Sequence, residues 1–435
     1  MRKRAYEIVY GVLEEQEHSD VIFHRITDKM KTLSVQEKRF LKRLSYGAIE
    51  LAVESDAYIR HFSSLSVRRL APSVRTVLRM ALYEILYMDT VPEAVSCHEA
   101  VELLKSVAGE RYAGFVNGVL RTMLRQRDEV RLRPWEKLSL PKNLYEYFLD
   151  RYGKKTTKKL ANAFLERQPE VTIHIDSNKI SVREYEEHLQ SRNLLYDSGH
   201  YMGDSFLIRH CDDVRSLPGY DEGWFFVQDE SSMLAVLCAD IKSGDTVVDV
   251  CASPGGKSMH ALLRMKGQGL LSYRDISEKK LSRVRENLRR LQYTNARGKV
   301  WDGTRTDREW QGRADVVLAD VPCSGMGIIG KKPEIKYHAL QKVEKLVPLQ
   351  REICQASLTM LRKGGVFLYS TCTICEKENE ENVMWLEEHC GLQRESLDSF
   401  LPEELQNKMT AQGMIQMLPG IHKSDGFFVA RFRKV

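Results

Sequence analysis

The sequence predicts three successive folding units: an all-α domain, a small α+β domain and a doubly wound α/β domain. Apolar residues recur at the helical period of 3.6 through about the first 130 residues. Alternating, strand-like segments occur between residues 145 and 230, and from residue 231 short apolar runs alternate with helical stretches. A chain of 435 residues has room for two to four domains of ordinary size.

The first unit, residues 1–130, is expected to be helical because one apolar face repeats three times. Ala5, Ile8, Val9 and Val12 begin the series, and the same spacing returns in residues 74–85, after Pro72, and in residues 115–124. No alternating pattern of similar strength interrupts it. Residues 131–144 carry two prolines that break the periodicity, so they are expected to form a linker.

The second and third units are predicted from their strands. Residues 170–177, 205–210 and 223–228 alternate like half-buried strands, which indicates a small α+β domain over 145–230. From 231 to 435, the apolar runs at 245–250, 269–273, 314–320 and 364–370 are separated by helical stretches. That alternation predicts a mainly parallel sheet covered by helices on both faces.

Composition excludes several classes of protein. With 43% hydrophobic and 29% charged residues the chain can bury cores and is not disordered. It has no apolar run long enough to span a bilayer and no secretory signal, so a cytoplasmic protein without a membrane segment is expected. Nine cysteines, an odd number, argue against a disulfide framework and for a reducing compartment.

A glycine-rich turn follows the first strand of the third unit. Pro254, Gly255 and Gly256 lie between an apolar strand and a helix, where backbone can approach a ligand and helix N–H groups are free. The dinucleotide fingerprint G-x-G-x-x-G is absent. A phosphate-binding P-loop fails because Cys251 stands where its first glycine is needed. The cofactor turn of a methyltransferase and an ordinary strand–turn–helix junction remain as alternatives.

Four aspartates lie at or near the ends of predicted strands. They are Asp249, Asp275, Asp302 and Asp320. The carboxyl ends of parallel strands form the edge at which open α/β sheets bind ligands. Asp275 is placed to accept both hydroxyls of a ribose, and Asp302 to meet an adenine. Each aspartate taken singly is equally well explained as a helix cap or turn residue.

Two cysteines follow buried strands at the same predicted edge. Cys323 and Cys372 are therefore candidates for nucleophilic chemistry, which needs a thiolate. Cys372 and Cys375 also form a CxxC pair, which is found in redox sites and in half-sites for zinc. No second CxxC is present, so no metal site is expected.

These motifs together resemble the NOL/NOP2/Sun family of RNA cytosine-C5 methyltransferases. The likeness covers about residues 230–435 and rests on CASPGGK (251–257), DVPCSG (320–325), GKKPEIKY (330–337), STCT (370–373) and DGFFVARF (425–432), with VQDESSM (227–233) leading in. Val321 is a mild departure. FVNGVLRTMLR (115–125) resembles the NusB-like RNA-binding domain. A second departure is the strand at 170–177, where His174 and Asp176 stand in place of the family's Arg-x-Asn.

The resemblance implies an all-α NusB-like domain, a small α+β domain and a Rossmann-like domain that uses S-adenosylmethionine. It implies that Cys372 adds to carbon 6 of cytosine, that Cys323 serves product release, and that Asp320 and Lys257 approach the base. The cofactor contacts it implies are Cys251, Ala252, Ser253, Pro254, Gly255, Gly256, Lys257, Asp275, Asp302 and Asp320.

The same resemblance implies an RNA partner. The bacterial members that pair these two domains act on cytosine 967 of 16S rRNA, which implies unassembled rRNA or an early small-subunit particle as substrate and a monomeric enzyme. Candidate RNA contacts are Arg121, Arg125, Arg127, Lys332 and Lys336. Two other classes are carried forward: a P-loop ATPase or helicase, and a non-enzymatic RNA-binding protein of the antitermination type.

Overall fold

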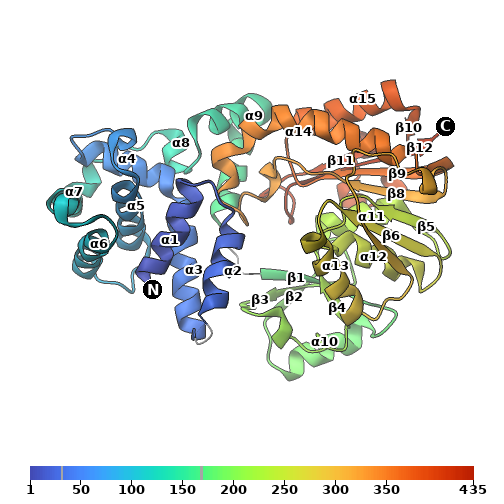
Figure 1. Ribbon diagram of the computed structural model, residues 1–435, viewed down its shortest axis with the longest axis horizontal. Helices are drawn as coiled ribbons and strands as arrows, with labels where there is room; N and C mark the ends of the chain where they lie inside the picture. Colours follow the sequence, from blue (N-terminus) through green and yellow to red (C-terminus); the bar gives the residue numbers. More distant parts are fainter. Residues whose placement is uncertain (31–32, 167–169) are drawn as a thin grey trace. The chain divides into compact units, whose positions relative to one another are not determined.

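The computed structural model describes residues 1–30, 33–166 and 170–435. The chain forms two compact units, and Figure 1 follows it through both. One unit comprises Met1–Glu166 together with Ile329–His338, and the other comprises Arg167–Ile328 together with Ala339–Val435. Within the described residues, no helix is both long enough and apolar enough to cross a membrane.

The first unit is helical, as the sequence predicts. Its helices are α1 (Arg2–Leu13), α2 (Ser19–Lys29), α3 (Val35–Glu50), α4 (Ala52–Phe62), α5 (Pro72–Tyr87), α6 (Glu93–Ala108), α7 (Ala113–Gln126), α8 (Pro134–Lys137) and α9 (Lys142–Leu165). Their apolar faces share one core. Helix starts follow local rules: Ser34 and Glu37 form a capping box before α3, and Pro72 occupies the first turn of α5.

The helical unit extends beyond the boundary expected at residue 130. Pro134 is in the first turn of α8, and Pro141 is the residue before α9. Proline lacks an N–H, but the first turn of a helix has no internal acceptor for one, so proline starts a helix there. The two prolines that suggested a linker over 131–144 therefore mark helix starts, and α9 belongs to the helical unit.

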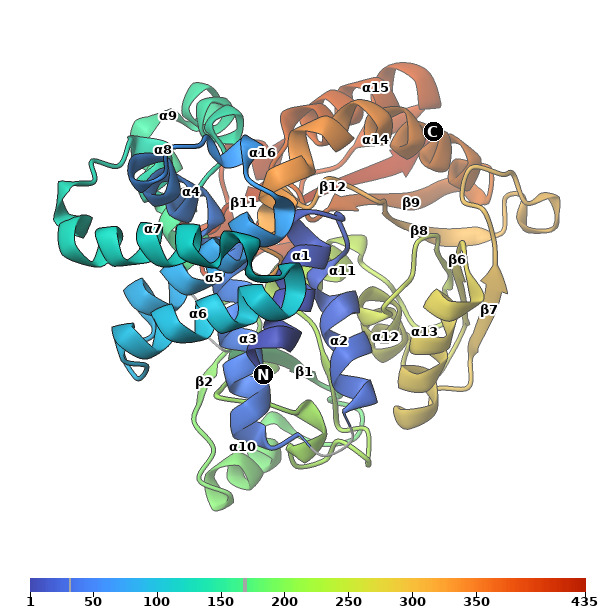
Figure 2. The same ribbon diagram turned by 60° about the vertical axis from the view of Figure 1, so that its left-hand side comes forward.

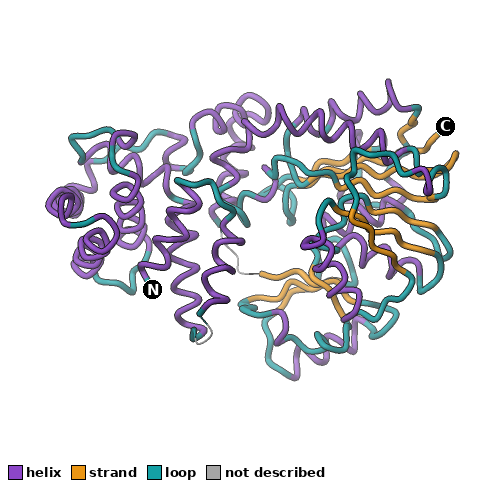
Figure 3. The backbone as a smooth tube through the Cα atoms, viewed as in Figure 1, coloured by secondary structure: helices purple, strands orange, loops and turns teal. Residues whose placement is uncertain are grey.

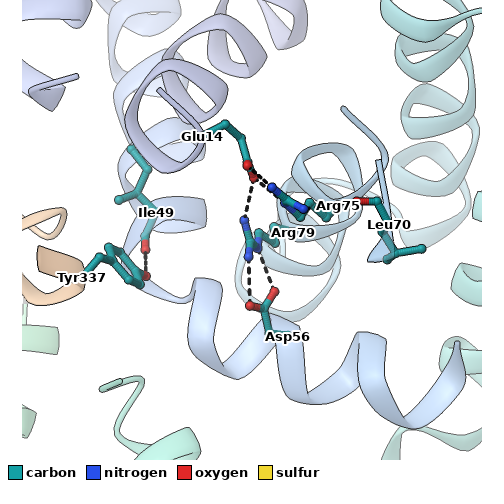
Figure 4. A network of polar contacts seen from close by, with 7 residues as sticks. All are labelled: Glu14, Ile49, Asp56, Leu70, Arg75, Arg79 and Tyr337. Atoms are coloured by element: carbon teal, nitrogen blue, oxygen red, sulfur yellow. Dashed lines mark hydrogen bonds and ion pairs between the residues drawn. The ribbon is translucent and has the colours of Figure 1, made fainter. Parts of the chain in front are cut away.

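Buried charges inside the helical unit are paired. Arg75 and Arg79 both donate to Glu14, and Arg79 also donates to Asp56 at 2.7 and 2.9 Å (Figure 4). The side chains of Arg79 and Glu14 are only 12% and 8% exposed. Breaking such a pair would leave an uncompensated charge in a poorly hydrated position, so the network ties α1, α4 and α5 to one arrangement.

A short segment from the second half of the chain, Ile329–His338, folds into the helical unit. The N–H and hydroxyl of Ser19 donate to the carboxylate of Glu334 at 3.1 and 2.9 Å, at the start of α2. The hydroxyl of Tyr337 donates to the carbonyl of Ile49 at 2.5 Å (Figure 4). The Lys336 ammonium is buried and donates to the carbonyls of Glu50 and Ser139.

Replacing Lys336 by methionine is expected to destabilise the protein by about 2 kcal/mol. Methionine keeps the length of the side chain but leaves the Ser139 carbonyl without the lysine donor, whereas the Glu50 carbonyl keeps the Ser139 hydroxyl as a donor; such a loss costs roughly 1–3 kcal/mol. Urea unfolding of K336M beside K155M, whose wild-type side chain is exposed, measures the difference. Equal unfolding midpoints for the two variants would contradict the structural role of Lys336.

The second unit begins with a small antiparallel sheet, which confirms the α+β region predicted from alternation. Its strands are β1 (Glu170–Ile175), β2 (Tyr196–Ser198), β3 (Ser205–Arg209) and β4 (Phe225–Val227), in the order β2-β3-β1-β4. Helix α10 (Val182–Ser191) lies between β1 and β2 in sequence and contributes Tyr185 and Leu189 to the apolar core of this sheet.

A larger sheet forms the centre of the second unit (Figure 3). Its strands are β5 (Thr246–Asp249), β6 (Leu270–Asp275), β7 (Ala296–Val300), β8 (Ala314–Asp320), β9 (Leu361–Thr371), β10 (Leu392–Arg394), β11 (Met414–Met417) and β12 (Phe427–Lys434). The order is β10-β12-β9-β8-β5-β6-β7, with β11 paired to β12. Strands β5 to β9 are parallel, and β10, β11 and β12 are antiparallel.

Helices cover both faces of the larger sheet. Apolar residues of α11 (Glu230–Ala239), α12 (Gly256–Met265) and α13 (Glu278–Arg290) pack on one face. Those of α14 (Ile335–Leu358) and α15 (Glu380–Cys390) pack on the other. The short helix α16 (Lys408–Ala411) precedes β11. The doubly wound architecture predicted from alternating strands and helices is confirmed, and it directs the carboxyl ends of β5, β6, β8 and β9 toward one edge.

Candidate functional site

The register of the parallel strands brings the predicted acidic residues to one edge. Asp249 is the last residue of β5 and lies beside Leu318 of β8. Asp320 ends β8 and lies beside Ser370 of β9. Asp275 ends β6. Since parallel strands end on the same side, three of the four aspartates named from sequence line the position at which such sheets bind ligands.

The glycine turn passes between β5 and α12 and is held against β6. The N–H of Ala252 donates to the carbonyl of Arg274 at 2.8 Å, and the N–H of Ser253 donates to the Asp275 carboxylate at 3.1 Å. Gly255 has φ +115°, a backbone conformation that side-chain-bearing residues rarely adopt. Glycine therefore lets the chain turn into α12, whose first N–H groups face the acidic edge.

Asp249 offers an acceptor that no described residue uses. Its Oδ2 accepts a hydrogen bond from the Ser258 hydroxyl at 2.6 Å, whereas its Oδ1 is buried and has no partner within the described part of the chain. Burial raises the pKa of Asp249 to about 7, against the stabilising bond from Ser258. A buried, unpaired carboxylate oxygen at a strand end suits a cationic ligand or a hydroxyl donor.

Replacing Asp249 by asparagine is expected to make stability less dependent on pH. The folded-state pKa of about 7 exceeds the value of about 4 in an unfolded chain. As pH rises from 4 to 7 the unfolded state loses this proton first, so the wild type loses stability relative to D249N. Unfolding free energies of both proteins at pH 4, 5.5 and 7 test this. A difference between them that stays constant over the three values would contradict it.

Asp302 lies close to the acidic edge but in an exposed turn. The N–H of Trp301 donates to the carbonyl of Asp275 at 2.9 Å, which places the start of the turn beside the end of β6. The Asp302 carboxylate accepts hydrogen bonds from the N–H and hydroxyl of Thr304 at 3.1 and 2.7 Å, and these bonds lower its pKa. Asp302 is therefore a turn residue, as one of the two interpretations of the sequence expects. Among the described residues, its other carboxylate oxygen lies 3.6 Å from Arg305 Nε.

Lys257 and Asp320 form a partly buried ion pair. Lys257 Nζ lies 2.7 Å from Asp320 Oδ2 and 4.8 Å from the centre of the Phe427 ring. The other oxygen of Asp320 accepts a hydrogen bond from the Ser370 hydroxyl at 2.9 Å. The lysine of the glycine turn thus contacts the aspartate that precedes Cys323 by three residues, and it holds that carboxylate at the end of β8.

The two candidate cysteines are in contact. Sγ of Cys323 lies 3.3 Å from Sγ of Cys372, and the N–H of Gly327 donates to the Cys372 carbonyl at 3.0 Å. The hydrogen bond between the thiols, together with burial, raises the pKa of Cys323 well above its usual range. The two thiols share one hydrogen bond, in which either sulfur can be the donor. In the described residues no three His, Cys, Asp or Glu side chains are grouped as metal ligands.

A buried polar network holds both cysteine loops, and sequence reasoning did not find it. Glu378 accepts hydrogen bonds from the N–H and hydroxyl of Ser324, the first at 2.8 Å, and from the Gln350 amide at 2.9 Å. The Ser324 and Thr373 hydroxyls lie 2.8 Å apart. Each loop is therefore tied to the other beside its cysteine. Burial raises the pKa of Glu378.

The strand that departs from the family pattern places His174 in the interior. His174 Nε2 lies 3.1 Å from Asp204 Oδ2, and its ring meets that of His260 at 4.4 Å, edge to face. Asp176 accepts a hydrogen bond from the Tyr293 hydroxyl at 2.8 Å. His174 and Asp176, the two residues that differ from the family pattern, therefore contact residues that follow or lie in the helices covering the larger sheet.

The basic residues proposed as RNA contacts differ in availability. Arg121 and Arg125 are exposed, whereas Arg127 pairs with Glu93 at 2.7 Å. Lys332 pairs with Asp20 at 3.2 Å and remains partly exposed. Lys336 is 4% exposed, and its ammonium donates hydrogen bonds to two backbone carbonyls. The expectation that Lys336 contacts RNA is therefore corrected: its charge stabilises the helical unit.

Comparisons with known proteins divide the chain in the same way as the sequence motifs. The family model described as 16S rRNA methyltransferase RsmB/F matches residues 236–433, and that of the NusB family matches residues 1–125. The chain is 30% identical over 446 residues to the probable ribosomal RNA small subunit methyltransferase B of Bacillus subtilis, covering 100% of this chain and 98% of that protein. For ribosomal RNA small subunit methyltransferase B of Yersinia enterocolitica the identity is 30% over 453 residues, with the same coverage.

Solved structures share the fold at lower identity. PH0851 superposes with a TM-score of 0.82 at 24% identity, covering 100% of this chain and 99% of that one. NSun6 from Pyrococcus horikoshii, solved with SFG, gives a TM-score of 0.60 at 21% identity over 68% of this chain and 98% of its own. SFG is an analogue of S-adenosylmethionine.

Proposed function

Because the chain belongs to the ribosomal RNA small subunit methyltransferase B family, we propose that it methylates carbon 5 of a cytosine in 16S rRNA, at position 967. The NusB-like and Rossmann-like domains expected from sequence are confirmed, and the cofactor is S-adenosylmethionine. The observation that carries the proposal is the contact of Cys323 and Cys372, 3.3 Å between sulfurs, at the edge that also holds the acidic strand ends.

The residues at this edge fit the cofactor. The donor carries a cationic sulfonium, a ribose and an amino acid moiety, and it supplies the methyl group when bound. The unpaired buried oxygen of Asp249 suits its cationic part, and the carboxylate of Asp275 suits the ribose hydroxyls. The free N–H groups of the 251–257 turn suit its carboxylate. Asp302 and Asp320 border the same edge.

The thiol pair supports covalent activation of the base. Carbon 5 of cytosine is a poor nucleophile, and addition of a thiolate to carbon 6 makes carbon 5 enamine-like. Cys372 is assigned this addition because it follows β9 in the STCT motif, the second cysteine motif of the family that the sequence resembles, and its sulfur lies beside that of Cys323. Asp320, held by Lys257 and Ser370, is assigned to the N3 edge of the base.

Release requires that the C5 proton be lost and that the C6–sulfur bond break. A water molecule takes the C5 proton, the C5–H electron pair forms the C5=C6 double bond, and the electrons of the C6–sulfur bond return to Cys372. Cys323 is assigned to this step because its sulfur lies 3.3 Å from that of Cys372, so its S–H is within reach to donate to the developing thiolate. The target base must leave its stack to reach this edge, which favours single-stranded or loop RNA in an unassembled or early particle.

Bisulfite sequencing of total RNA from cells with and without this protein tests the proposal, since methylated cytosine resists deamination. The expected result is one protected cytosine in 16S rRNA, at position 967, that becomes reactive when the protein is removed. An unchanged 16S rRNA pattern would overturn the substrate assignment. If the protein's removal exposes a cytosine to bisulfite in transfer RNA alone, the substrate is transfer RNA instead of 16S rRNA. Calorimetry with ATP separately tests the P-loop alternative.

A further inference from the structure

The positive charge of the chain is concentrated in one stretch. Residues 278–313 contain eleven Lys and Arg against five Asp and Glu. That excess of six equals the formal net charge of all 435 residues, +6. The remaining parts of the chain are therefore balanced as a whole, and this stretch contains none of the RNA contacts expected from sequence.

This stretch forms the outer edge of the larger sheet. It comprises α13, the terminal strand β7 and the turn that leads to β8. Figure 2 shows α13 beside β6 and β7, on which it packs. Six of its cations are exposed and have no carboxylate partner within the described part of the chain; we call them the basic edge. They are Lys279, Arg283, Arg289, Arg297, Arg308 and Arg313.

Like charges lie side by side on α13, although Glu278 in its first turn and Arg289 and Arg290 in its last turn suit the helix dipole. Lys279 and Arg283 are four residues apart and so are Arg285 and Arg289, which puts like charges side by side on the helix surface and destabilises it by roughly 0.2–0.5 kcal/mol for each pair. Lys279 also lies in the first turn, where the helix dipole disfavours a cation. An ordinary solvated helix would gain by alternating charge, so this pattern indicates an anionic partner.

We propose that the basic edge binds the phosphate backbone of RNA that flanks the target cytosine; this rests on the proposed function. The edge begins at the cofactor side, because Lys280 of α13 lies 3.1 Å from Asp275 at the end of β6. From there α13 and β7 lead away along the sheet. A row of unpaired cations at intervals along an edge neutralises successive phosphates of a strand whose base occupies the site.

The far part of the basic edge also has an aromatic surface. Arg297, Arg313 and Trp310 line a shallow hollow of about 520 Å³, together with Thr246, Leu270 and one acidic residue, Glu309. An indole with two guanidinium groups beside it offers a stacking surface for a base and charges for its phosphate. This combination favours a nucleic acid over other polyanions and places one flanking nucleotide in the hollow.

Fluorescence anisotropy with a labelled single-stranded RNA that contains the target cytosine, over a range of KCl concentrations, tests the basic edge. The variant K279Q/R283Q/R289Q is compared with K342Q/K345Q/K408Q, which removes three exposed charges from α14 and α16. The α13 variant is expected to bind RNA on the order of tenfold or more weakly and to lower the salt slope by roughly two. The control is expected to bind within about twofold of wild type. Thermal stability of the α13 variant should stay close to that of wild type, since the removal of two like-charge pairs offsets the loss of the Arg289 cation from the last turn.

The possible results distinguish failure of the basic edge as an RNA-binding surface from failure of the proposed methyltransferase function. Equal weakening by both variants would mean that net charge alone attracts RNA, and unaltered binding by the α13 variant would place the RNA elsewhere; either result overturns the inference. Binding of the α13 surface to vesicles of phosphatidylserine but not to RNA would also overturn it. If the wild type binds S-adenosylmethionine and methylates RNA, and the α13 variant binds RNA as well as the wild type does, the proposed function stands and only the RNA-binding role of the basic edge is refuted.

Discussion

Replacing Cys372 by alanine is expected to abolish methyl transfer, with a loss on the order of 10³-fold or more in turnover. Without the sulfur no bond forms at carbon 6, and carbon 5 stays too weak a nucleophile to accept a methyl cation equivalent. Serine in its place should not rescue the reaction, because its hydroxyl remains protonated at neutral pH. Binding of S-adenosylmethionine, followed by calorimetry, should persist, since Asp249, Asp275 and the glycine turn are unchanged.

The measurement uses RNA that carries 5-fluorocytidine at the target. Fluorine at carbon 5 is not lost as a proton is, so a wild-type enzyme that adds through sulfur is expected to remain bound to the RNA on a denaturing gel. C372A should give no such band. The control is C390A, which removes a thiol at the end of α15 and should behave as wild type. Methylation or a retained band with C372A would refute the assignment of the nucleophile.

The sequence was sufficient to predict the larger sheet because its strands are buried on both faces. Such strands are continuous apolar runs, and the run predicted at 314–320 coincides with β8 (Ala314–Asp320). Once the strands were located, parallel topology alone brought Asp249, Asp275 and Asp320 to one edge. The apolar runs locate the strands, and parallel strand order brings their carboxyl ends together, so residues far apart in the chain could be placed at one site.

The placement of residues 329–338 could not be predicted from the sequence. No local pattern indicates that Glu334 accepts hydrogen bonds from Ser19, 315 positions away, or that Lys336 serves two carbonyls of the helical unit. A lysine in a polar segment is usually solvated, and its burial depends on acceptors supplied by distant helices. The same holds for Glu378, whose partners Ser324 and Gln350 come from other elements.

Replacing Cys323 by alanine is expected to leave addition possible and to slow release, so that a covalent protein–RNA complex accumulates with ordinary cytidine RNA. In the wild type the sulfurs of Cys323 and Cys372 lie 3.3 Å apart, so the Cys323 thiol can donate to the thiolate that leaves carbon 6. Removing that donor leaves the departing thiolate without a hydrogen bond in a buried position, which costs about 1–3 kcal/mol and slows expulsion roughly 5- to 160-fold. The substitution removes a single sulfur atom at a site held by Ser324 and Glu378.

Denaturing electrophoresis of each variant after incubation with RNA and S-adenosylmethionine gives the readout. A slow band should appear with C323A, be absent with C390A, and disappear again in the double variant C323A/C372A, because the trapped bond is to the second sulfur. Serine at position 323 retains an O–H donor and should give an intermediate amount of the complex. If C323A forms no complex while Cys372 remains essential, the leaving sulfur does not depend on its neighbour. Release would then have to be assigned to another group at this edge.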